Sequence, residues 1–341
     1  MEPRFVMNSE SIRMACIGCG RIAQDHLFAM SSLENVSIVG VVDSQADVVQ
    51  SVANQYECKG YVTIEDLLND QTIDAVLVCT PPASHCEVAC FFLSRGIHVL
   101  CEKPLAITSA EGEVMKRAAL ASNKILMMAT KFRFVDDVVK AKGIIESGVL
   151  GRLLFFENTL CSFVDMTKRW NSNPEISGGG VLIDNGTHSI DMARFLLGEI
   201  DSVQAVRGPQ IQDVAVEDTV RVFFKTRNEV LGSIDLSWSL HKPMDEYVTI
   251  YGTEGSLSIG WKRSAYLVRN RQDWIVFGSG YSKREAFIKQ HRHFADCIRG
   301  NASPIINMED GIHSINIISA AYTSMKEKKW FKINGNNKND S

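Results

Sequence analysis

The sequence lacks the features that would place the protein in a membrane or on a nucleic acid. Its 341 residues contain no apolar run of about 18 residues, the length that a transmembrane helix needs. Lys and Arg (36) do not outnumber Asp and Glu (40), and the net charge of −4 gives no electrostatic reason to bind DNA, RNA or anionic lipid. The first ten residues lack the apolar core of a secretory signal peptide. We therefore expect a cytoplasmic protein whose partner is a small molecule, with no nucleic acid and no membrane involved.

Cysteines arranged in pairs are also lacking. The nine cysteines are scattered, and several, such as Cys79 and Cys101, lie in apolar runs, as buried reduced thiols do. Cys16 and Cys19 match the C-x-x-C spacing of a redox or metal pair. However, Cys16 lies in an expected strand, Cys19 lies between two glycines of a turn, and no second pair stands at zinc spacing. We interpret the match as chance and expect no metal site.

What the chain does contain is the composition of a globular protein, with 45% hydrophobic and 22% charged residues. The length exceeds what one small core needs, so two domains are expected. Residues 1–132 alternate apolar strands with helices, which predicts an α/β domain with a doubly wound parallel Rossmann sheet. Residues 133–333 contain several strands joined by short turns, which predicts an α+β domain with a large open, mostly antiparallel sheet. The polar residues 334–341 are expected to be a disordered tail.

A dinucleotide-binding signature opens the first domain. The apolar strand 13–17 runs directly into Gly18-Cys-Gly20-Arg-Ile-Ala23, a helical pattern follows, and the next strand ends on Asp43, 23 residues after Gly20. The glycines allow a tight turn and a close approach of a pyrophosphate to the helix N-terminus. Asp43 can accept both ribose hydroxyls and repels a 2′-phosphate, and no Arg or Lys stands beside it. The sequence therefore predicts NAD as the cofactor, with NADP less favoured.

Two later strands of the same domain end in short motifs. The apolar run 75–79 is followed by Thr80-Pro81-Pro82, and the run 97–101 is followed by Glu102-Lys103-Pro104. Ligands of doubly wound sheets bind beyond the carboxyl ends of the strands, so these motifs should meet the glycine turn there. The expected cofactor-binding residues are Gly18, Gly20, Arg21, Ile22, Asp43, Thr80, Pro81, His85, Glu102 and Lys103.

A second candidate site lies in the other domain. Three glycines at 178–180 precede a helical pattern in which Asp184 and His188 stand four residues apart, one turn from each other on one face. A carboxylate and an imidazole on the same face suit acid/base chemistry, although a histidine satisfied within the core would show the same pattern. Asp191 extends the stripe, where it either orients the ring or has a purely structural role.

With these motifs in place, the chain resembles the Gfo/Idh/MocA family of glucose–fructose oxidoreductase and inositol dehydrogenase relatives. The resemblance runs from the glycine turn through the Glu-Lys-Pro element to Asp-x-Gly-x-His at 184–188. It implies oxidation or reduction of a secondary hydroxyl on a sugar, a sugar derivative such as a phosphate or nucleotide sugar, or an inositol. It also implies a sheet that mediates oligomerisation, to a homodimer or homotetramer, and catalytic roles for Lys103, Asp184 and His188.

The resemblance leaves the substrate and some roles open. The run Lys131-Phe-Arg133-Phe departs from the run found in many members. The expected substrate-site residues are Arg133, Arg169, Trp170, Asp184 and His188. Either the imidazole or the lysine of the catalytic set could accept the proton of the hydroxyl. The alternatives are a redox-neutral member, either an aldose–aldose oxidoreductase or a glycosidase that recycles bound NAD, and a sugar sensor without catalysis.

Overall fold

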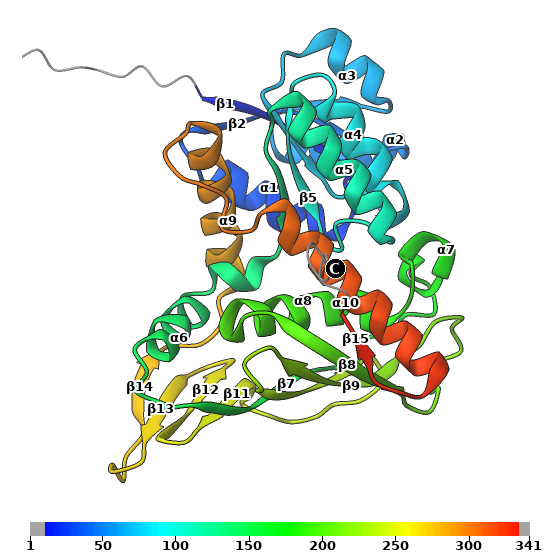
Figure 1. The fold of residues 1–341 in the computed structure, drawn as a ribbon. Helices are drawn as coiled ribbons and strands as arrows, with labels where there is room; N and C mark the ends of the chain where they lie inside the picture. The colour runs from blue at the N-terminus through cyan, green and yellow to red at the C-terminus, as the bar shows by residue number, and fades with distance from the viewer. Residues whose placement is uncertain (1–10, 334–341) are drawn as a thin grey trace, which may run out of the picture.

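The computed structural model describes residues 11–333, and within this range the chain forms two sheets, one of six strands and one of nine. Figure 1 shows the first sheet and its helices in the upper half of the molecule and the large sheet in the lower half. The expectations for the N-terminal ten residues and for a disordered tail at 334–341 lie outside the described residues. No helix between residues 11 and 333 is both long and apolar enough to cross a lipid bilayer.

The first sheet is parallel throughout, with the strand order β3-β2-β1-β4-β5-β6. Its strands are β1 (Ile12–Ile17), β2 (Val36–Val42), β3 (Lys59–Tyr61), β4 (Ala75–Val78), β5 (His98–Glu102) and β6 (Leu126–Ala129). The connecting helices are α1 (Arg21–Ser31), α2 (Ala46–Gln55), α3 (Ile64–Asp70), η1 (Pro82–Ser84), α4 (His85–Leu93) and α5 (Ser109–Ser122). Every residue of β4 is buried because helices cover both faces of the sheet. The predicted doubly wound Rossmann sheet is confirmed, with the strand order reversing between β1 and β4.

The second sheet is mostly antiparallel, as predicted. Only β7 and β10 pair in parallel within the order β14-β13-β12-β11-β7-β10-β9-β8-β15 of the described residues. The strands are β7 (Leu153–Cys161), β8 (Ile200–Arg207), β9 (Thr219–Thr226), β10 (Leu231–Ser237), β11 (Glu246–Gly252), β12 (Gly255–Gly260), β13 (Ser264–Val268), β14 (Ile275–Gly278) and β15 (Phe331–Lys332). Buried and accessible residues alternate along β9, so one face of the sheet packs inward and the other faces solvent.

The chain beyond β6 also forms helices. They are η2 (Lys131–Phe134), α6 (Asp136–Glu146), η3 (Trp170–Ser172), α7 (Pro174–Ser177), α8 (Val181–Leu197), α9 (Lys283–Ile298) and α10 (Met308–Glu327). In Figure 1, α8 and α10 cross the middle of the molecule, above the large sheet and below the parallel one. Almost every residue of α8 is buried, as expected for a helix enclosed by a sheet, another helix and η2.

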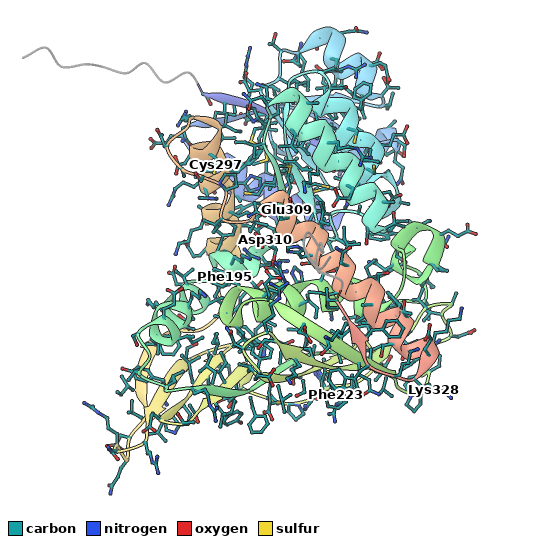
Figure 2. All side chains as sticks on the ribbon, in the orientation of Figure 1. Phe195, Phe223, Cys297, Glu309, Asp310 and Lys328 are labelled. Carbon is teal, nitrogen blue, oxygen red and sulfur yellow. The ribbon has the colours of Figure 1, made fainter. Side chains whose placement is uncertain are left out.

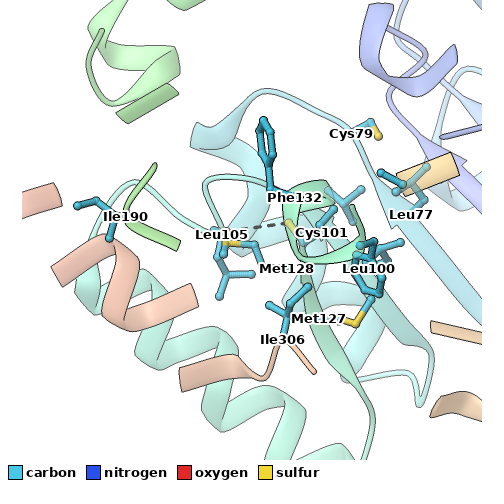
Figure 3. Packing of buried hydrophobic residues seen from close by; sticks show 14 of the residues in the cluster. Leu77, Cys79, Leu100, Cys101, Leu105, Met127, Met128, Phe132, Ile190 and Ile306 are labelled. Carbon is cyan, nitrogen blue, oxygen red and sulfur yellow. Dashed lines mark hydrogen bonds between the residues drawn. The ribbon is translucent and has the colours of Figure 1, made fainter. Parts of the chain in front are cut away.

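One continuous core joins the two halves. Figure 3 shows Cys101 of β5 and Met128 of β6 close to Leu105 and to Ile306, the latter from the segment before α10. Ile190 of α8 belongs to the same buried cluster. Helix α9 also packs on α1, although the two are more than 250 residues apart in the chain. The expected division at residue 132 falls inside η2, and spatially the C-terminal helices cover part of the Rossmann sheet.

Candidate functional site

A cavity of about 990 Å³ lies between the carboxyl ends of the parallel strands and the N-terminal half of α8. The first half of the chain contributes Gly20–Ile22, Asp25, Thr80, Pro82 and residues 102–104 to its wall. Lys131 and Phe132, directly after β6, also line it, and the second half contributes Asp184, His188 and the loop residues Lys168, Arg169 and Trp170. The fold thus brings the expected cofactor edge and the expected catalytic helix to the same cavity.

The glycine turn has the shape that a dinucleotide needs. Gly18 has φ +92°, and a Cβ there would lie 2.7 Å from the carbonyl carbon of Cys79, so only glycine fits. A Cβ on Gly20 would meet no atom of the described residues within 4 Å, which leaves an open face in front of the N-terminus of α1. No side chain between residues 11 and 333 caps that N-terminus, so its N–H groups remain available to phosphate oxygens.

Asp43 stands at the end of β2, next to this turn. Its Oδ2 accepts a hydrogen bond from the Cys19 backbone N at 2.9 Å, and its Oδ1 accepts one from the Gln45 backbone N at 3.0 Å. The carboxylate therefore braces the glycine turn and is held at the strand end where a ribose would lie. Together with the uncapped helix, this arrangement fits a bound NAD.

The two halves of the site are linked by an ion pair. Lys103, directly after β5, pairs through Nζ with Asp184 Oδ1 and donates to the Asp184 carbonyl oxygen at 3.1 Å. Their side chains are 15% and 26% exposed, which leaves both of them accessible from the cavity. The pair holds a lysine from the parallel sheet against the first turn of α8.

Glu102 supports this arrangement from behind. It accepts a hydrogen bond from the Lys103 backbone N at 3.1 Å, and its Oε1 lies 2.8 Å from Nε2 of His26 on α1. Burial alone would raise the pKa of Glu102, but the His26 hydrogen bond and the nearby positive charges outweigh burial and hold that pKa below its usual value. A buried carboxylate that is ionised in this way fixes the backbone from which Lys103 projects.

His188 lies one turn beyond Asp184 and is only 7% exposed. Its Nδ1 is buried and has no hydrogen-bond partner among the described residues, which leaves Nε2 as the ring nitrogen that can face the cavity. The ring meets Phe132 edge-on at 5.2 Å. Burial and then the charges of Lys103 and Lys131 hold the pKa of His188 well below 6.5. The ring is therefore neutral at cellular pH and has an open acceptor position.

The start of α8 is fixed by a residue that the sequence pattern did not reveal. Glu217, from the loop before β9, accepts hydrogen bonds from the backbone N of Gly180 at 3.0 Å and of Leu182 at 3.1 Å. It thereby caps the orphan N–H groups of the helix from outside the segment. Gly178 takes φ +79° and Gly179 φ +154°, conformations that the preceding chain needs to reach this point.

The structure contradicts the expected role of Arg133 and decides between the two roles that were open to Asp191. Arg133, expected to line the substrate site, lies behind α8 with its guanidinium 2.7 Å from Asp191 Oδ1 and 3.2 Å from Asp310 Oδ2. It takes no part in the cavity wall, because a buried cation must stay with its carboxylates. Asp191 does not orient the His188 ring, because its oxygens accept from Arg133 and from Thr130 Oγ1. Of its two possible roles, the structural one holds.

Of the remaining residues expected at the site, some line the cavity and others do not. Arg21, Ile22 and Thr80 line the cavity, and so do Arg169 and Trp170, from the loop that ends at η3. His85 does not reach it, because its ring nitrogens lie 2.8 Å from the carbonyl oxygens of Thr80 and Pro104. His85 therefore holds two site-forming loops together from below. Gly18, Pro81 and Asp43 adjoin the cavity without lining it.

Several residues that line the cavity could not be predicted from patterns in the sequence. Lys283 on α9 ion-pairs with Asp25 on α1 at 2.6 Å, a contact between segments far apart in the chain. Trp261 and Tyr281 form an aromatic wall, with ring centroids 5.5 Å apart, and Tyr281 stacks on Phe132. Within residues 11–333, no group of three or more His, Cys, Asp or Glu side chains is arranged to hold a metal ion.

Comparison with known proteins agrees with this geometry. Residues 12–130 match the Gfo/Idh/MocA model described as an oxidoreductase family with an NAD-binding Rossmann fold, and residues 142–333 match the model of its C-terminal alpha/beta domain. Levoglucosan dehydrogenase of Pseudarthrobacter phenanthrenivorans is 31% identical over 65% of this chain and 62% of its own length. Myo-inositol 2-dehydrogenase of Thermotoga maritima is 24% identical over 94% of this chain and 98% of its own.

Among solved structures, a levoglucosan dehydrogenase in complex with NADH and levoglucosan superimposes with a TM-score of 0.88. That structure is 24% identical in sequence and covers 95% of this chain and 100% of its own. At that identity the likeness establishes the shared fold.

The burial of His188 leads to a measurable protonation state. We expect its ring ¹⁵N resonances to remain those of a neutral imidazole when the pH is lowered from about 7.5 to about 6, where free imidazole becomes substantially protonated. Replacement of Lys131 by Met should raise the pKa of His188 because one positive charge is lost, while burial should keep it below 6.5. A His188 ring that is protonated at about pH 6 in the wild-type protein would contradict this description.

Proposed function

The chain belongs to the Gfo/Idh/MocA oxidoreductase family, and from this premise we propose that it is an NAD-dependent dehydrogenase acting on a secondary hydroxyl of a sugar, a sugar derivative or an inositol. The observation that carries the proposal is the meeting of Lys103, Asp184 and His188 at one cavity that also contains the glycine turn. The relatives named above act on levoglucosan and on myo-inositol, which supports this substrate class.

We further propose a division of labour along the chain. Residues 1–132 hold the cofactor, and residues 133–333 supply the substrate wall and the association surface. The glycine turn, Asp43 and Thr80 would hold the dinucleotide, which when bound provides the acceptor for the hydride of the oxidised carbon. The cytoplasm is the proposed location, since all nine cysteines are free, which suits a reducing compartment.

In the proposed reaction, the chain itself handles the hydroxyl and its proton. Lys103 Nζ donates a hydrogen bond to the reacting oxygen and stabilises the negative charge that develops on it. His188 Nε2 accepts the hydroxyl proton. It can do so because the low pKa keeps the ring neutral before the reaction, and the ring has no hydrogen-bond partner among the described residues. Asp184 keeps Lys103 in place and favours the imidazolium electrostatically. The aromatic wall of Trp261 and Tyr281 excludes water and offers faces to a sugar ring.

The decisive experiment combines substrate screening with two variants. The protein should raise the absorbance at 340 nm with NAD⁺ and at least one member of a panel of inositols, free sugars, sugar phosphates and nucleotide sugars. Lys103→Met and His188→Ala should each lower turnover of that substrate by about 10²- to 10⁴-fold, the range for a lost acid/base or charge-stabilising group. Both variants should still bind NADH, measured by nucleotide fluorescence.

Different results would identify the alternatives. Cofactor that stays bound through purification and never accumulates in reduced form would indicate a redox-neutral member. Binding of sugar and NADH without any turnover would indicate a sensor. If His188→Ala keeps its turnover while Lys103→Met loses it, the proton passes to Lys103 instead.

Cofactor preference should depend on Asp43. Asp43→Ser combined with Ser44→Arg should shift the preference from NADH toward NADPH, because the repulsion of a 2′-phosphate is lost and a cation is gained. The double variant should also bind both nucleotides more weakly overall, since Asp43 no longer braces Cys19. Ser44→Arg alone, with the carboxylate kept, should still prefer NADH. Tighter binding of NADPH than of NADH by the wild-type protein would rule out this role for Asp43.

The outer face of the large sheet is the proposed association surface. Phe155, Leu231 and Tyr251 are 50%, 47% and 37% exposed. They lie side by side across β10, β7 and β11, because Phe155 pairs in register with both of the others. Figure 2 shows side chains projecting below the sheet, where no helix of the described residues covers them. A contiguous apolar row of this kind is typical of an interface, so we propose a homodimer or homotetramer.

Charge on that row should break the assembly. Phe155→Lys with Leu231→Lys should reduce the mass measured by sedimentation or light scattering, because two lysines from each protomer would be desolvated at each symmetric contact. Leu120→Lys, at a residue of α5 that is 62% exposed and far from the sheet, is the matched control and should leave the mass unchanged. A wild-type protein that sediments as a monomer would refute the proposed surface.

A further inference from the structure

Lys131 lines the cavity but has no role in the proposed reaction. It lies two residues after the end of β6 and lines the cavity. Strand β6 pairs with β5, which Lys103 directly follows, and Glu102 stands in register with Ala129. Its Nζ lies 5.6 Å from the centroid of the Phe132 ring and 5.8 Å from that of Phe287, so aromatic faces form its immediate surroundings. A lysine surrounded by aromatic rings is partly desolvated, which costs free energy unless its charge is paired.

The cavity is lined by more cations than anions. Its basic side chains are Arg21, Lys103, Lys131, Lys168, Arg169 and Lys283. Its acidic side chains are Asp25, Glu102 and Asp184. The excess positive charge creates a potential that favours the binding of an anion.

Each of those acidic side chains already has a partner. Asp184 pairs with Lys103, and Asp25 lies 2.6 Å from Lys283 Nζ. Glu102 is held by His26 and by the Lys103 backbone N. Among the described residues, the ammonium group of Lys131 has no ion pair or hydrogen bond. It makes the two cation–π contacts and interacts at longer range with the charges of Glu102 and Asp184.

The cofactor would not supply the missing anion. Its pyrophosphate belongs at the N-terminus of α1, directly after β1, and the sheet order places β6 three strands away from β1. At the usual spacing of neighbouring strands this separation is roughly 14 Å. The nicotinamide would bring no anion either, since its ring is positively charged when oxidised and neutral when reduced. The substrate is therefore the remaining source.

We propose that the substrate carries an anionic substituent, a carboxylate or a phosphate, which Lys131 binds while the oxidised hydroxyl lies at Lys103 and His188. This inference rests on the proposed function and narrows its substrate class to sugar acids and sugar phosphates. Cation–π contact compensates an ammonium group only in part, whereas a charge-assisted hydrogen bond to an anion in a partly dry site is among the strongest polar contacts available. Lys168 and Arg169, on the loop beside the cavity, add positive potential that attracts the same substituent.

The protonation of Lys131 adds a second means of testing the proposal. Burial and then the charge of Lys103 lower the pKa of Lys131 to about 8, with Lys283 acting in the same direction and Glu102 and Asp184 opposing it. The lysine is therefore mostly charged at pH 7 and loses its charge as the pH rises above about 8. The preference for an anionic ligand should fall over that interval, since carboxylates and phosphates remain ionised there.

The test uses matched ligands on the complex of the protein with NADH. Each set holds a neutral hexose, its uronate and its 6-phosphate, in the gluco, galacto and manno configurations, and affinity is measured by calorimetry. In at least one set an anionic member should bind about tenfold or more tightly than the neutral one, and the uronate and phosphate arms identify which anion is preferred. Lys131→Met should remove about 10- to 100-fold of that affinity and leave the affinity for the neutral hexose and for NADH unchanged.

Two control variants separate this role from general charge effects. Lys131→Arg should keep most of the preference and should make it independent of pH up to about 9.5, because arginine stays protonated there. Lys283→Met removes another cation from the same cavity, one already paired with Asp25, and should leave the ratio of anionic to neutral affinity unchanged. Should Lys131→Met fail to fold, the pH series on the wild-type protein and on Lys131→Arg still decides the question.

The inference fails if neutral and anionic members bind equally in every set, or if Lys131→Met weakens both alike. Turnover separates this failure from that of the proposed function. Oxidation of neutral sugars or inositols without any anion preference overturns the inference alone. A Lys131-dependent anion preference with no turnover of any ligand overturns the proposed dehydrogenase activity and supports the binding site.

Discussion

The site depends on a buried ion pair that lies outside it. Arg133, at the end of the parallel sheet, and Asp191, in the middle of α8, are 5% and 0% exposed and share two hydrogen bonds through the Arg133 Nε atom. Asp310 on α10 joins this pair, and Arg194 of α8 joins Asp310 at 3.2 Å. Arg194 also pairs with Glu199 at 2.9 Å, so two cations and three carboxylates form one network where three segments meet. Because unpaired charges would be costly there, α8 has one favourable position against the Rossmann sheet.

That position determines the chemistry one and two turns earlier on the same helix. With Asp191 anchored and Glu217 capping the N-terminus, Asp184 can meet only the strand end that carries Lys103. The resulting ion pair lies in a region that is partly closed to water, where charges act over longer distances than in solvent. The same burial keeps His188 neutral. The position of α8 thus determines both the contact between Lys103 and Asp184 and the protonation state of His188.

Local sequence patterns predicted much of this arrangement. The glycine turn with Asp43, the motif around Lys103 and the stripe of Asp184 and His188 are each contained in one short segment, and their roles depend on spacing along a strand end or a helix. Both sheets could be inferred because the alternation of strands and helices changes near residue 132. Short edge strands such as β3 and β15 were not predicted, since two or three residues carry no usable period.

The sequence by itself determined which groups are available and which face of each element they occupy. The tertiary structure alone decided which of them are partners. Arg133 was expected in the cavity, and its withdrawal to Asp191 and Asp310 could not be foreseen because these carboxylates lie 58 and 177 residues away. Lys131 is its near neighbour in the chain, yet it lines the cavity without a carboxylate partner among the described residues. The difference arises because desolvation and pairing depend on contacts between distant segments, which spacing along the chain does not encode.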